Sequence, residues 1–151
     1  MRRAAILSVC TLGLIAACMG SSGPRKLGGT TQANSICEPN HFQDFLDQFS
    51  EDVQVQRKHT AFPLRKRENR HVTTQLDSVP VELNLKEPDV RFPVYPNPTQ
   101  LHDQSLTVEV SAENGDKKQV RVSRADTGYL VVYSFEHDRC WRLTRVEDMS
   151  P

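Results

Sequence analysis

The sequence has 151 residues, of which 37% are hydrophobic and 25% are charged, and its 19 basic and 19 acidic side chains cancel. This composition is typical of a globular domain and excludes collagen, a coiled coil and a membrane protein with many spans. Zero net charge also argues against a nucleic-acid-binding protein, because binding to phosphates usually requires a basic excess.

The beginning of the sequence predicts a secretory signal peptide. Arg2 and Arg3 form a short cationic segment, and the apolar stretch 4–14 that follows is shorter than the roughly 20 residues needed to span a bilayer. Residues 15–18, Ile-Ala-Ala-Cys, resemble the lipobox of bacterial lipoproteins. The alternative is an ordinary signal peptide that happens to contain Cys18.

The lipobox resemblance implies cleavage before Cys18 and attachment of acyl chains such as palmitate to this cysteine. Met19 stands where many lipoproteins retained in the inner membrane have Asp, so the resemblance favours the outer membrane, with the domain facing the periplasm. Residues 18–151 carry 17 basic and 19 acidic side chains, a net charge of −2.

Cleavage and lipidation would leave two cysteines, Cys37 and Cys140. In an oxidising compartment such a pair usually forms a disulfide, which we predict here. The alternative is a catalytic thiol. Neither cysteine has the neighbouring Cys or His spacing of a zinc site, so no metal site is expected.

Residues 18–36 are predicted to be a lipidated flexible tether, because residues 19–35 are poor in apolar side chains and show no periodicity. Residues 37–151 are predicted to form the folded domain. Its first element is a helix capped by Asn40, which breaks near residues 50–52 and continues as a short helix to about Lys58. The helix is predicted from an apolar stripe of 3.6-residue period formed by Phe42, Phe45, Leu46, Phe49 and Val53.

After Thr60 apolar and polar residues alternate, which predicts half-buried antiparallel strands. Asn114-Gly115 predicts a hairpin between two of these strands. Residues 128–135 are apolar at successive positions, which favours a central strand covered on both faces. Four prolines predict an irregular crossing or edge segment between strands, namely Pro88, Pro93, Pro96 and Pro98.

A helix or helix pair followed by strands predicts an α+β domain in which the helices pack on a curved antiparallel sheet. The arrangement resembles a family of uncharacterised bacterial lipoproteins with an NTF2-like, cone-shaped fold. This resemblance implies an NTF2-like fold but no catalytic residues. It is carried by Phe42, Phe45, Phe49, Asp52, Gln56, Phe62-Pro63-Leu64, Tyr129 to Phe135, Trp141 and Leu143.

Two charged stretches have opposite sign. Residues 38–52 contain five acidic and no basic side chains, whereas residues 57–70 carry a local charge of +5. These stretches are either complementary solvated faces or docking surfaces, whose fields would steer a charged partner. The candidate docking patch consists of Arg57, Lys58, Arg65, Lys66, Arg67 and Arg70.

The resemblance to NTF2-like domains also implies a cone that can enclose an apolar pocket, in which some relatives use a buried Asp, His or Tyr for proton transfer. Asp52, Tyr129 and Tyr133 are candidate pocket residues for proton transfer, and the alternative is that both tyrosines only pack. The sequence contains no nucleophile elbow, phosphate loop or metalloprotease motif, so no cofactor is expected.

These observations favour a membrane-anchored periplasmic module that binds a protein without catalysis, such as an immunity or inhibitor protein or an envelope scaffold. The alternative is a small-molecule-binding or isomerase- or hydrolase-like pocket protein. An open apolar pocket with an inward acid would favour the alternative, whereas a filled cone with exposed charges would favour protein binding. The oligomeric state stays open.

Overall fold

A computed structural model describes residues 41–71 and 78–151. The predicted signal peptide, Cys18, the tether and Cys37 lie outside the described residues. None of the helices within those two ranges is long and apolar enough to cross a membrane.

The described residues form an α+β domain that begins with two helices, α1 (Phe42–Glu51) and α2 (Val53–Lys58), as predicted. The hairpin of β1 (Thr60–His71) and β2 (Ser78–Leu85) follows. A 3-10 turn, η1 (Glu87–Asp89), and a short helix, α3 (Pro98–Asp103), precede the remaining strands. These are β3 (Thr107–Asn114), β4 (Lys117–Ser123), β5 (Leu130–His137) and β6 (Trp141–Asp148).

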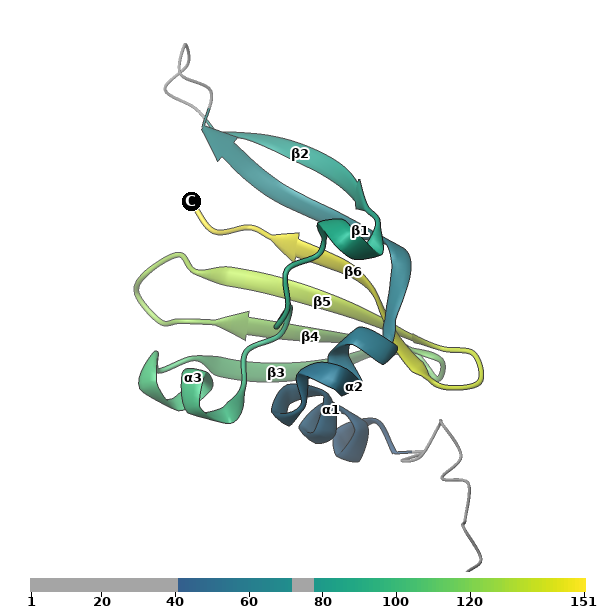
Figure 1. The fold of residues 1–151 in the computed structure, drawn as a ribbon. Helices are drawn as coiled ribbons and strands as arrows, with labels where there is room; N and C mark the ends of the chain where they lie inside the picture. The colour runs from purple at the N-terminus through teal and green to yellow at the C-terminus, as the bar shows by residue number, and fades with distance from the viewer. Residues whose placement is uncertain (1–40, 72–77) are drawn as a thin grey trace, which may run out of the picture. The chain divides into compact units, whose positions relative to one another are not determined.

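The strands form one curved six-stranded sheet with the order β2-β1-β6-β5-β4-β3 (Figure 1). Four of its pairs are antiparallel, but β1 and β6 are parallel, with Thr60 opposite Leu143. The expectation of a wholly antiparallel sheet was therefore wrong. The strands β1 and β6 are the first and last of the domain and are not joined by a hairpin, which would require them to run antiparallel, so their connection allows a parallel pair.

The helix α1 forms where the apolar stripe predicts it, because its apolar residues face the sheet. Phe45 and Phe49 are buried, while Asp44, Asp47 and Gln48 lie on the exposed side. The helix begins at Phe42 with His41 as its N-cap, whose side chain makes no capping bond. The prediction of Asn40 as the cap was therefore wrong.

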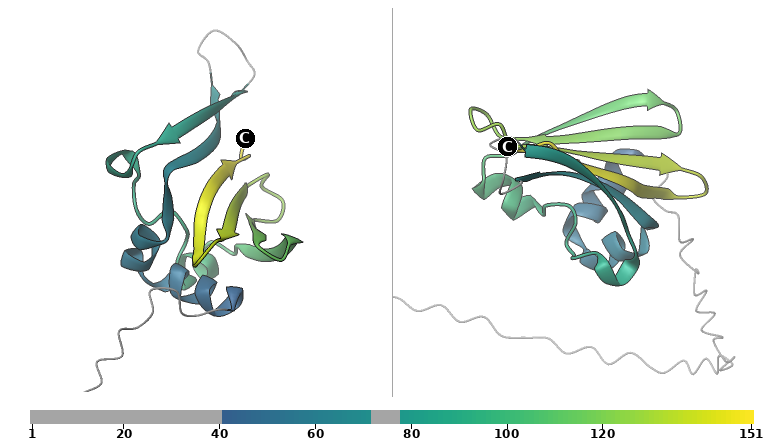
Figure 2. Two further views of the ribbon diagram at one scale, coloured as in Figure 1. Left: turned by 90° about the vertical axis from the view of Figure 1, so that its right-hand side faces the viewer. Right: turned by 90° about the horizontal axis from the view of Figure 1, so that it is seen from above.

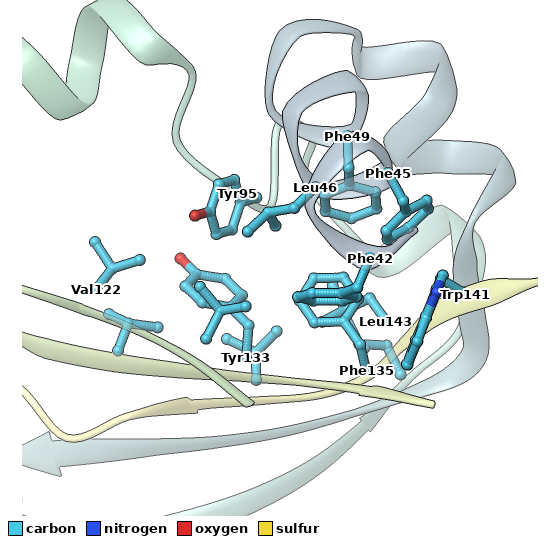
Figure 3. Close-up of a cluster of buried hydrophobic side chains, with 14 of the residues drawn as sticks. Phe42, Phe45, Leu46, Phe49, Tyr95, Val122, Tyr133, Phe135, Trp141 and Leu143 are labelled. Carbon is cyan, nitrogen blue, oxygen red and sulfur yellow. The ribbon is translucent and has the colours of Figure 1, made fainter. Parts of the chain in front are cut away.

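The core lies between α1 and the concave face of the sheet. Phe135 of β5 packs edge-on against Phe42, Phe45 and Phe49, with ring centroids 5.3–5.9 Å apart (Figure 3). Each such aromatic pair contributes about 0.5–1.5 kcal/mol beyond the area that it buries. This end of the domain is consequently filled by the protein's own side chains.

The proline-rich stretch crosses the concave face of the sheet from η1 to α3, in agreement with the crossing segment predicted from its prolines (Figure 1). We call residues 89–97 the crossing segment. Its Tyr95 is 2% exposed and packs edge-on against Tyr133 of β5, with ring centroids 4.9 Å apart. The helix α3 then starts with a capping box between Asn97 and Gln100, which fixes where the segment ends.

The strand β5 lies between β6 and β4, which confirms its central position. Among the described residues, however, all helices lie on one side of the sheet (Figure 2). Val132 faces the other side and is nevertheless 5% exposed, with Arg121 and Glu147 as its register neighbours. Within the described ranges, the second apolar face of β5 is therefore buried among neighbouring long side chains, and no helix or strand packs on it.

Candidate functional site

A cleft of 630 Å³ lies between the β1–β2 hairpin and the crossing segment, and we call it the hairpin cleft. Strand alternation places every second residue of β1 on its wall. Because the opposite wall comes from residues 89–94, two distant parts of the sequence meet here. The lining residues are Leu64, Lys66, Glu68, Arg70, Leu83, Leu85, Asp89, Val90, Arg91, Pro93, Val94 and Val146.

The floor of the hairpin cleft is apolar. Leu64 of β1 is 2% exposed, and Val90 and Val146 are also buried. Leu83 of β2 is half-buried and pairs with Lys66 across the hairpin. A ligand that entered the cleft would therefore meet aliphatic side chains from β1, β2, β6 and the crossing segment.

The rim of the cleft is charged. The Glu68 carboxylate accepts hydrogen bonds from Lys66 at 2.6 Å and Arg70 at 2.8 Å, and these bonds hold the pKa of Glu68 below its usual value. Asp89 and Arg91 stand exposed on the opposite wall. With three cations against two carboxylates, the rim carries a small positive excess.

The six residues of the predicted docking patch are distributed over several surfaces. Lys66 and Arg70 line the hairpin cleft, whereas alternation turns Arg65 and Arg67 toward the opposite face of the sheet. On that face the Arg67 guanidinium lies 3.9 Å from both Glu82 and Glu147. The structure therefore brings only two of the four cations of β1 together in the cleft.

The other two patch residues lie on α2. The Arg57 guanidinium stacks over the Phe92 ring, 4.6 Å from its centroid. Lys58 lines a second depression, which also contains His59 and Cys140. The predicted partner of Cys140, Cys37, lies outside the described residues, so their disulfide stays a prediction.

The three candidate pocket residues lie in different surroundings. Asp52 is exposed at the junction of α1 and α2, where its carboxylate accepts a hydrogen bond from the Gln54 backbone N–H at 2.7 Å. Its visible role is therefore that of a helix cap. Tyr133 is 4% exposed in the core, and desolvation by burial raises its pKa strongly, so its hydroxyl stays protonated.

Tyr129 is half-buried and lines a depression of 210 Å³ together with Tyr95 and α3. Burial is the main cause that raises the pKa of Tyr129. Figure 3 shows the hydroxyls of Tyr95 and Tyr133 pointing the same way, away from the phenylalanine cluster. The tyrosines thus lie at the end of the core next to the start of β3. Asp52 lies apart from them, at the surface, as the N-cap of α2.

Gln56 is a site residue whose role the sequence did not reveal. It is 0% exposed, and its Oε1 accepts hydrogen bonds from the backbone N–H groups of Val94 at 2.7 Å and Tyr95 at 3.1 Å. Its Nε2 donates to the Tyr95 carbonyl at 3.0 Å. No local pattern signals this role, because the extended Asp52 separates Gln56 on α2 from the apolar stripe of α1.

The side chains of the hairpin cleft are suited to binding a ligand. The cleft combines aliphatic contacts with cations that can pair with an acidic group. No group of three His, Cys, Asp or Glu side chains that could hold a metal ion occurs in residues 41–71 and 78–151.

Neither a protein-family model nor a curated protein matches the sequence. Among solved structures, the domain is similar to the crystal structure of an NTF2-like protein from Bacteroides fragilis, with a TM-score of 0.53 and 19% sequence identity. The fold is NTF2-like.

The match covers 76% of this chain and 49% of the Bacteroides protein, so the similarity spans about half of that protein. At 19% identity it shows the fold alone, and it confirms the NTF2-like α+β domain predicted from the sequence. Membership of a lipoprotein family stays a prediction.

Proposed function

We propose that the chain is a lipid-anchored protein of the cell envelope whose NTF2-like domain binds a partner protein without catalysis. The hairpin cleft carries this proposal, because it joins an apolar floor to a weakly cationic rim. We propose that it receives a segment of the partner with apolar and acidic side chains.

The charges of the cleft support binding more than proton transfer. Lys66 and Arg70 hold the pKa of Glu68 below its usual value, whereas a general acid or base works best with a pKa near the working pH. Tyr133 is protonated and buried among core side chains. Neither group has the properties of a general base.

The anchoring part of the proposal rests on the sequence. The lipobox ending at Cys18 supports lipid attachment, and Met19 supports the outer membrane. A module tethered in this way meets partners at the periplasmic side of the membrane. An immunity or inhibitor protein and an envelope scaffold would use the cleft in the same manner.

The experiment is a pull-down from envelope extracts with the full chain and two charge-reversal variants. Arg91→Glu changes the rim of the cleft, and Arg65→Glu is the matched control on the opposite face of the sheet. We expect Arg91→Glu to reduce recovery of the partner at least about tenfold, because the variant places a carboxylate beside the acidic segment. Arg65→Glu should leave recovery unchanged. Equal recovery with both variants would refute the cleft as the docking site.

A second candidate is the binding of a small amphiphile with an anionic end, favoured by the cleft volume of 630 Å³, which lies within the range of small-molecule pockets. Native mass spectrometry of the chain purified from cells tests this candidate. A bound mass below about 1 kDa, the scale of drug-sized ligands, that Arg91→Glu removes would favour the amphiphile. Its absence, with a protein recovered in the pull-down, would favour the first proposal.

A further inference from the structure

The strand β3 forms one edge of the sheet, and all eight of its residues are exposed. An edge strand of this length presents a row of backbone N–H and C=O groups to solvent, and such a row readily pairs with another strand. Two of its residues, Val108 and Val110, are 36% and 43% exposed. These are two of the most exposed large apolar side chains among the described residues.

The two valines extend the apolar side of the sheet to its edge. Val108 lies opposite Val122 and Val110 lies opposite Val120 on β4, and both β4 valines are 0% exposed. Residues opposite each other in a sheet share a face, so Val108 and Val110 belong to the concave, core-facing side. No described helix or strand covers them.

The opposite edge of the sheet is less suited to pairing. It is formed by β2, which contains Pro80, and proline cannot donate a backbone hydrogen bond to an added strand. The strand β3 contains no proline and no lysine. Alternation places Glu109 and Ser111 on the convex side. The pairing with β4 is irregular at Glu113, but its carboxylate accepts a hydrogen bond from the side chain of Gln119, the partner of Ser111, so Glu113 also lies on the convex side.

We propose that β3 pairs antiparallel with β3 of a second copy of this chain, around a two-fold axis at Val110. In this register Val110 faces Val110, Val108 faces Ala112, and Glu109 faces Ser111 of the second copy. The apolar side chains then cover one another on the concave side, and each Glu109 meets a hydroxyl.

The charges select this register over its neighbour. An axis at Ser111 would place Glu109 opposite Glu113 of the second copy, and like charges directly opposite each other destabilise a sheet. The axis at Val110 avoids this contact. It joins two sheets into one and leaves the hairpin cleft of each copy open at the far edge. The pairing therefore does not depend on the proposed function.

Cysteine cross-linking of the full chain in detergent tests the register, with the unsubstituted chain as background. We expect Val110→Cys to form a disulfide-linked dimer on mild oxidation, because directly opposed Cβ atoms lie about 4.5–5.5 Å apart. Val108→Cys alone should not cross-link, since two copies of residue 108 lie four residues apart along the pair, about 13 Å. A mixture of Val108→Cys and Ala112→Cys chains should cross-link.

Sedimentation equilibrium of the same detergent-solubilised chain tests the edge itself. Val110→Lys places two ammonium groups on the axis and should raise the dimer dissociation constant at least about tenfold. Val79→Lys on β2 is the matched control, because Val79 is 39% exposed, and it should change the constant less than about twofold.

Two results would overturn the proposal. One is a chain that stays monomeric at all concentrations and whose Val110→Cys variant forms no cross-link between two copies. A Val110→Cys adduct to a different protein counts as this result, because it is not a cross-link between copies. The other is equal cross-linking of the Val108→Cys and Val110→Cys chains, since paired strands in one register cannot give it.

Discussion

Gln56 links the helical part of the domain to the wall of the proposed binding site. Its amide makes three hydrogen bonds with the backbone of Val94 and Tyr95, and no part of the side chain reaches solvent. Buried backbone groups that lose their partners cost about 1–3 kcal/mol each. The position of the crossing segment, and with it one wall of the hairpin cleft, therefore depends on this side chain.

We predict that Gln56→Leu lowers the free energy of unfolding by about 2–4 kcal/mol, because at least one N–H and one C=O of the crossing segment lose their partner. Urea unfolding of the full chain measures this loss. Gln54→Leu, an exposed position on the same helix, is the control and should change stability by less than about 0.5 kcal/mol. Equal effects of the two substitutions would show that the amide does not hold the segment.

His59 is a buried titratable residue at the end of α2. Its Nδ1 donates a hydrogen bond to the Trp141 carbonyl at 3.0 Å, and its ring packs against Phe45. Desolvation by burial is the largest cause and lowers the pKa of His59 below 6.5. The hydrogen bond to the Trp141 carbonyl opposes this shift, and Lys58 and Arg142 add smaller lowering effects. The folded state thus favours the neutral imidazole.

This lowered pKa predicts a pH dependence of stability. Below pH 6.5 the unfolded chain binds a proton at His59 more readily than the folded chain does. The contribution of His59 to the free energy of unfolding is therefore complete above pH 6.5 and declines as the pH falls toward the folded-state pKa. His59→Asn, which keeps a donor for the Trp141 carbonyl, should flatten this part of the profile. Urea unfolding between pH 5 and 8 measures it, with His102→Asn on the exposed face of α3 as control. Identical profiles for the two variants would contradict the prediction.

At the scale of elements, α1 is held in place by its aromatic face. Phe49 is 0% exposed and contacts the rings of Phe45, Tyr95 and Phe135. It therefore touches the helix, the crossing segment and the sheet at once. Removing this ring opens a cavity at the point where all three meet.

We predict that Phe49→Ala lowers the free energy of unfolding by about 3–5 kcal/mol, the usual cost of deleting a fully buried phenyl ring. Chemical denaturation followed by circular dichroism is the measurement. Gln48→Ala, on the exposed side of the same helix, should have an effect below about 0.5 kcal/mol. A loss below about 1 kcal/mol for Phe49→Ala would mean that α1 does not depend on this contact.

The elements follow from the sequence to different degrees. Hydrophobic periodicity predicts α1 and most strands, since it reports which face of an element is buried, and Asn114-Gly115 marks the β3–β4 turn. Periodicity does not report which strand lies beside which. The parallel pairing of β1 with β6 depends on contacts such as Thr60 with Leu143, which no local pattern encodes.

The candidate site was harder to predict for the same reason. The run of cations at residues 57–70 is visible in the sequence, but alternation along β1 separates Arg65 and Arg67 from Lys66 and Arg70. The other wall of the cleft comes from residues 89–94 and is positioned through Gln56. These long-range contacts require the folded chain.

For the whole molecule, the proposed anchor makes a separate prediction. Cys18→Ser removes the thiol that the lipobox would present for acylation, so the variant should leave the detergent phase in Triton X-114 partitioning or accumulate as an unprocessed precursor. Cys10→Ser, in the predicted signal peptide, is the control and should partition like the unchanged chain. Unchanged partitioning of Cys18→Ser, together with processing to the same mature mass as the unchanged chain apart from the substitution, would refute lipid attachment.

Binding in the hairpin cleft is the central claim at this scale, and site-specific photocross-linking in intact cells tests it most directly. Leu83 and Asn84 are neighbours on β2 that point to opposite faces, and only Leu83 lines the cleft. With benzoylphenylalanine at each position in turn, we predict a discrete protein adduct from position 83 and none from position 84. No adduct from position 83, or the same adduct from both positions, would contradict the cleft as the binding site.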